Sequence, residues 1–126
     1  MPSLPVTAVF VTFYAIALFI MVARVGLRRK AVLALHGDKQ DTELHKRIRI
    51  HGNLTETTPA FALTLLIAEL LDLGTLWLWL AVAIFLFGRV WHYHHFNSSK
   101  RGIGMVFTLL PGILLGAWSI YASLLG

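Results

Sequence analysis

Three polar side chains with different headgroups share one face of the segment RIRIHGNLTE, residues 47–56. Arg49, Asn53 and Glu56 stand at i, i+4 and i+7, so on a helix they fall within about 60° of one another. A guanidinium, an amide and a carboxylate at this spacing can hold a small ligand that carries both charges. The same groups can also fasten two helices through an ion pair, and the spacing leaves both possibilities open.

A second polar stripe lies in the segment GRVWHYHHF. Its members recur at i, i+3, i+4 and i+7 and are Arg89, His92, Tyr93 and Phe96. Arg89 lies inside an apolar run, where an unpaired charge is costly. We expect Glu56 to be its partner, because both residues lie near the same end of two consecutive segments joined by a short turn.

The composition indicates a membrane protein. The 126 residues are 57% hydrophobic and 13% charged, whereas soluble domains carry about 25% charged residues. The absence of cysteine excludes disulfides and thiolate metal sites, so any sulfur chemistry must come with a substrate. The net charge of +5 is concentrated at segment ends. Topology signals and anionic headgroups account for it there, so we do not expect nucleic-acid binding.

Four segments have the length to cross a bilayer, which takes roughly 20 predominantly apolar residues. We expect helices over about 5–29, 42–71, 75–96 and 103–125, in one domain that spans residues 1–126. Short connections between such helices predict an all-α, integral membrane, up-down-up-down bundle of four helices.

The distribution of lysine and arginine predicts the topology. Eight of the eleven lie between Arg24 and Arg49, and the other three lie near the connection at 97–102. The positive-inside rule therefore puts the connections at 28–46 and 97–102 in the cytoplasm and both termini outside.

The histidines near the end of the third segment are candidate metal or haem ligands. His92, His94 and His95 lie close together, and His51 could join His92 as a second axial haem ligand. No aspartate or glutamate lies near them in the sequence, so we favour an interfacial histidine cluster and expect no metal.

The carboxylate of Glu69 lies near the outer end of the second segment, beside Asp72. We expect it to be solvated there. A carboxylate within a membrane could instead serve a proton-coupled transporter, in which Glu56 would be the coupling group.

The segments RIRIHGNLTE, TPAF and GRVWHYHHF, followed by a basic turn and a fourth apolar segment, resemble the MAPEG family. These are the membrane-associated proteins in eicosanoid and glutathione metabolism. Members carry Arg-x-x-x-Asn-x-x-Glu and a following proline on the second helix, and Arg-x-x-His/Tyr-x-x-x-Tyr on the third. The resemblance covers nearly the whole chain. In size the chain resembles the small prokaryotic-type members, and we expect it in the bacterial inner membrane.

The resemblance implies a homotrimer of four-helix subunits, with glutathione bound between neighbouring subunits at the cytoplasmic side. By position, Arg49, Asn53 and Glu56 would hold glutathione, and Arg89 and His92 would belong to the same binding network. Phe96 stands where several members have a tyrosine, so a hydroxyl is missing here.

The resemblance also implies a reaction. Members place a thiolate-stabilising arginine near the start of the fourth helix, where this chain has Met105, and Arg101 lies slightly earlier. Arg101 is therefore the candidate catalytic residue. The implied function is membrane-bound glutathione binding, with glutathione as co-substrate for transferase or peroxidase chemistry on lipophilic electrophiles. A non-catalytic ligand-binding or structural protein of the same fold, and a small four-helix transporter, remain alternatives.

Overall fold

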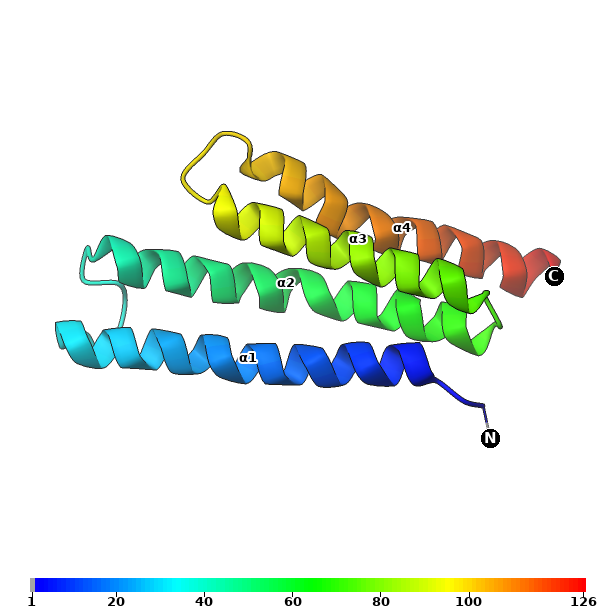
Figure 1. Cartoon of the computed structure of the whole chain (residues 1–126), viewed down its shortest axis with the longest axis horizontal. Helices are drawn as coiled ribbons and strands as arrows, with labels where there is room; N and C mark the ends of the chain where they lie inside the picture. The colour runs from blue at the N-terminus through cyan, green and yellow to red at the C-terminus, as the bar shows by residue number, and fades with distance from the viewer. Residues whose placement is uncertain (1) are drawn as a thin grey trace.

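Four helices joined by three short connections make up the computed structural model, which describes residues 2–126 (Figure 1). They are α1 (Pro5–Val32), α2 (Thr42–Leu70), α3 (Thr75–His94) and α4 (Arg101–Leu125). These bounds differ from the predicted ones by at most three residues, and the all-α fold class is confirmed. The connections at 33–41 and 95–100 lie at one end of the bundle, called the loop end below. The chain termini and the 71–74 turn lie at the other.

The most polar helix, α2, lies against all three other helices. α1, α3 and α4 are each long and apolar enough to cross a membrane, and α1 buries only Val6, Thr7 and Phe10. α2 and α3 each contact all three other helices, whereas α1 and α4 do not touch. The apolar helices therefore offer their exposed side chains to lipid, and α2 shares its polar groups with helical neighbours.

Three phenylalanines join α1, α2 and α3 at the centre of the bundle. The rings of Phe61 and Phe85 stack with centroids 4.4 Å apart, and the ring of Phe10 meets both edge-on at 5.0 and 5.6 Å. All three side chains are buried. Such offset and edge-to-face pairs add to the stabilisation from burial alone, so the cluster fixes how these helices pack.

Two glycines bring α3 and α4 almost into backbone contact. A Cβ placed on Gly88 would lie 2.6 Å from the amide nitrogen of Thr108 and 2.7 Å from the carbonyl oxygen of Gly104. A Cβ placed on Gly104 would lie 2.8 Å from the backbone of both Gly88 and His92. Close approach at small residues is a principal source of helix association in membranes. The pairing of α3 with α4 therefore depends on these two positions.

Glu69 caps the start of α1, so the expectation that it is solvated was wrong. Its carboxylate is only 8% exposed and accepts hydrogen bonds from the amides of Val6 at 2.9 Å and Thr7 at 2.8 Å. The residue before α1 is Leu4, which offers no side-chain cap. The first amides of a helix need acceptors and favour negative charge. A carboxylate from the end of α2 fills this role.

We expect Glu69→Leu to destabilise the protein by about 3 kcal/mol, because two amides lose bonds to a charged acceptor. Glu69→Gln keeps one acceptor oxygen and should cost less. The loss is measurable by titration with a denaturing detergent, and hydrogen exchange should accelerate first at residues 5–10. Asp72→Asn removes a charge at the same end without removing a cap, and equal destabilisation by Asp72→Asn would contradict the capping role.

We expect Gly88→Ala to destabilise the bundle by roughly 1–3 kcal/mol, since the new methyl group meets backbone atoms of α4 that cannot rotate away. Gly26→Ala is the matched control, because a Cβ at Gly26 meets no atom within 4 Å. That variant should be unchanged or slightly more stable, as alanine favours the helix. The same detergent titration compares the two variants. Equal stabilities would show that the close contact at Gly88 does not stabilise the fold.

Candidate functional site

An open groove of about 960 Å³ lies at the loop end, between α2 on one side and α3, α4 and their connection on the other. Polar and basic side chains form most of its wall. The lining residues are His45, Arg49, Asn53, His92, Phe96, Asn97, Ser98, Ser99, Arg101, Gly102 and Met105. Four of the six predicted site residues are among them: Arg49, Asn53, His92 and Arg101.

Asp41 anchors the start of α2 to the end of α1. Its carboxylate accepts two hydrogen bonds from the Arg28 guanidinium, both at 2.9 Å, and one from the Leu44 amide at 2.8 Å. The Arg28 guanidinium, followed by the Leu44 amide, lowers the pKa of the Asp41 carboxyl below its ordinary value. The carboxylate thus stays ionised at neutral pH and positions the first turns of α2, which carry the groove residues.

The α2 wall of the groove carries Arg49 and Asn53, one turn apart. Glu56 does not line the groove. A Cβ placed on Gly52 would lie 3.5 Å from Nη1 of Arg49 and 3.8 Å from Oε1 of Glu56. The side chains of Arg49 and Glu56 therefore converge above Gly52, on an exposed face of α2 beside the groove.

Arg89 does not pair with Glu56, so that prediction was wrong. The Arg89 Nε donates to the Thr108 hydroxyl at 2.9 Å, and Nη2 donates to the Met105 sulfur at 3.1 Å. No ion pair among residues 2–126 includes Arg89 or Glu56. The reason is the glycine contact, which turns the Arg89 face of α3 toward α4. Glu56 is left exposed on α2.

The third-helix stripe divides between two sites. His92 is buried at 5% exposure and lines the groove with Phe96, and their rings meet edge-on with centroids 6.2 Å apart. Tyr93 lies outside the groove, where its ring faces the Lys46 ammonium at 5.0 Å. His92 and Tyr93 are adjacent in sequence and so point about 100° apart around the helix.

The α4 wall begins with Arg101, the first residue of the helix. Arg101 is exposed, and Met105 follows one turn later on the same wall. The indole Nε1 of Trp91 donates to the Lys100 carbonyl at 2.9 Å and so ties the turn before Arg101 to α3. A cation therefore borders the groove opposite Arg49.

The polar turn before α4 also contributes to the groove, which was not predicted. Asn97, Ser98 and Ser99 line the groove, and no motif singled them out. Their signal is a run of three small polar residues directly before the basic pair Lys100 and Arg101. Such residues offer hydroxyl and amide groups to a polar ligand.

A comparison with protein families shows to which family the chain belongs. The sequence profile of the MAPEG family matches residues 4–121. The chain belongs to the MAPEG family. The resemblance seen in the sequence is thus confirmed, and the protein is an integral membrane four-helix bundle. Neither a search of curated proteins nor a search of solved structures found a match.

The MAPEG family includes glutathione-dependent transferases and peroxidases. In the groove wall, Phe96 supplies an aromatic ring without a hydroxyl group, and Met105 supplies a thioether. Arg89, which does not line the groove, donates to the Met105 sulfur from α3. The groove thus keeps two cations, an amide and an imidazole, which suit a small anionic ligand with hydrogen-bonding groups.

Proposed function

We propose that this MAPEG protein binds glutathione in the loop-end groove and transfers it, or uses it to reduce peroxides, with lipophilic electrophiles as partners. The observation that carries the proposal is the assembly of Arg49, Asn53, His92 and Arg101 around one open groove, from three different helices. Glutathione carries two carboxylates, one ammonium and two amides. Arginine binds carboxylates through its planar fork, and the asparagine amide can both donate to and accept from a peptide bond.

Glu56 gives the proposed site its acidic group. It lies beside Arg49 above Gly52, outside the groove wall. An ammonium group at the open edge of the groove would meet this carboxylate, while Arg49 holds a carboxylate further in. The ligand's opposite charges are thus matched by opposite charges on one face of α2.

The groove is open, and we infer that a neighbouring subunit covers it in a homotrimer. Arg49 and Glu56 are exposed in the single chain although they lie on a helix of a membrane bundle. An exposed charge at this position needs a partner, a ligand or water. Since all lysines and arginines lie toward the loop end, we also infer that this end faces the cytoplasm of a bacterial inner membrane.

Arg101 is the proposed catalytic residue. A guanidinium near the glutathione sulfur favours the thiolate, and the thiol proton leaves to water. The thiolate then forms a sulfur–carbon bond to an electrophile, and the leaving group departs with the displaced electron pair. With a hydroperoxide, the thiolate takes the terminal oxygen and releases an alcohol. A second glutathione then converts the sulfenic acid to a disulfide and water.

We expect Arg49→Ala and Asn53→Ala each to weaken glutathione binding by roughly 1.5–3 kcal/mol, as each removes a hydrogen bond that involves a charged group. Calorimetric titration measures the affinity. Lys30→Ala is the charge-matched control for Arg49, because Lys30 lies at the loop end but outside the groove. If binding is lost only in variants that also unfold, Arg49 and Asn53 serve to hold helices together and do not bind the ligand.

We expect light scattering, corrected for bound detergent, to give the mass of three chains. Arg49 and Glu56 are exposed in the single chain and are shielded better in an assembly than alone. A stable monomer that binds glutathione with unchanged affinity would exclude a site shared between subunits.

The experiment that tests the proposed function uses the ultraviolet absorbance of the glutathione thiolate. With glutathione saturating, we expect the thiolate to form at lower pH than in free solution, because Arg101 stabilises its charge. Arg101→Leu should abolish this shift and leave most of the affinity. Lys100→Leu removes the same charge from the same turn but does not alter the groove wall. If the glutathione thiol titrates at the same pH in wild type and Arg101→Leu, Arg101 has no catalytic role and the protein only binds glutathione.

A further inference from the structure

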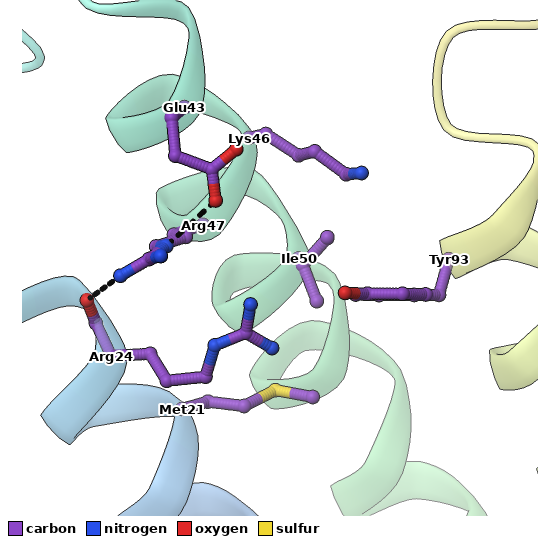
Figure 2. Close-up of a pocket in the computed structure, with 7 residues that line it drawn as sticks. All are labelled: Met21, Arg24, Glu43, Lys46, Arg47, Ile50 and Tyr93. Atoms are coloured by element: carbon purple, nitrogen blue, oxygen red, sulfur yellow. Dashed lines mark hydrogen bonds and ion pairs between the residues drawn. The ribbon is translucent and has the colours of Figure 1, made fainter. Parts of the chain in front are cut away.

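A second polar site lies where α1, α2 and α3 meet at the loop end. It is a crevice with a cavity of about 20 Å³, and it shares no lining residue with the groove. Figure 2 shows three cations around it, Arg24 from α1 and Lys46 and Arg47 from α2, with Glu43 as the one carboxylate among the crevice residues. Tyr93 closes it from α3 and points its hydroxyl group into the crevice.

The contacts leave two of these cations without a carboxylate. Arg47 takes the only one: its Nε donates to Glu43 at 2.8 Å, and its Nη1 donates to the Arg24 carbonyl at 2.9 Å. Within residues 2–126, the Arg24 guanidinium and the Lys46 ammonium form no hydrogen bond or ion pair. The Lys46 ammonium lies 5.0 Å from the centre of the Tyr93 ring. The crevice therefore has an excess of positive charge.

The depth of Arg24 decides which anions can reach it. α1 begins at Pro5, and 19 residues at about 1.5 Å each place Arg24 about 28 Å along the helix axis. The hydrocarbon core of a bilayer is about 30 Å thick. Arg24 therefore lies at the boundary between hydrocarbon and headgroups, where lipid phosphates are the abundant anions. Met21 lies one turn deeper, so the polar crevice opens onto an apolar surface.

We propose that this crevice binds the phosphate of an anionic phospholipid. Its cavity holds one water-sized group, so one phosphate oxygen enters between Arg24 and Lys46 while the remaining oxygens stay at the mouth. The Tyr93 hydroxyl donates to the same phosphate. The acyl chains lie along Met21 and the exposed apolar surface of α1. A zwitterionic lipid brings its own cation to this basic surface and binds less well.

The test measures retained lipid by native mass spectrometry after purification from nanodiscs of mixed phosphatidylglycerol and phosphatidylcholine. Wild type should retain phosphatidylglycerol in preference to phosphatidylcholine. Arg24→Gln and Lys46→Gln should each reduce that retention about fivefold, the effect of one cation near an anionic surface. Tyr93→Phe keeps the ring that faces Lys46 and should cause a smaller loss. The Arg24 carbonyl that holds Arg47 remains in Arg24→Gln, and circular dichroism checks that each variant stays folded.

The matched control is Lys30→Gln, which removes one charge from α1 outside the crevice. An equal loss of phosphatidylglycerol in Lys30→Gln and Arg24→Gln would overturn the site in favour of diffuse attraction, and so would equal retention of the two lipids in wild type. A further arm adds inorganic phosphate or glycerol phosphate to the nanodiscs. Displacement of the lipid at millimolar concentrations would show that a soluble phosphate occupies the crevice, which would overturn the lipid assignment.

Discussion

The close contact between α3 and α4 determines where the polar groups of the bundle lie. Without side chains at Gly88 and Gly104, the two backbones meet, and α3 can rotate only slightly against α4. That rotation directs Arg89 onto Thr108 and Met105 and places His92 at the edge of the groove. It also sets Arg101 and Met105 beside His92, on the same wall. The absence of side chains at Gly88 and Gly104 thus determines the positions of Arg89, His92, Arg101 and Met105.

The charged residues of the bundle fall into two groups. Asp41 and Glu69 bind groups on another helix, and Glu43 pairs with Arg47 one turn later on α2. Arg24, Arg49 and Glu56 have no such partner among residues 2–126 and border the crevice or the groove. Burying a charge without a partner is costly, so the structure reserves its unpaired groups for places that a ligand, a lipid or a second subunit can reach.

The sequence predicted what depends on neighbouring residues along the chain. Helix bounds followed from apolar length, and Arg49 and Asn53 share the groove because the helical repeat puts i and i+4 together. The partner of Arg89 could not be predicted from neighbouring residues, because it depends on which helix α3 packs against. The short turn between α2 and α3 favoured α2 as that helix. In the structure, the close contact at Gly88 and Gly104 instead packs the Arg89 face of α3 against α4.

Two other failures have related causes. The stripe from Arg89 to Phe96 was treated as one face, but its members span about 100° of the helix, so Tyr93 reaches a different site. Glu69 looked solvated because nothing near it in the sequence needs an acceptor. The amides that need it lie 62 and 63 residues earlier, at the start of another helix.

The long separation between Glu69 and its amides has a consequence for how the protein enters the membrane. During synthesis, α1 leaves the ribosome well before α2, and Leu4, which precedes it, offers its first amides no side-chain acceptor. Its first amides need water as a partner until α2 has formed and brings Glu69 beside them. The first helix therefore cannot reach its final state by itself. The two-helix hairpin is the smallest unit that inserts with every terminal amide satisfied at Val6 and Thr7.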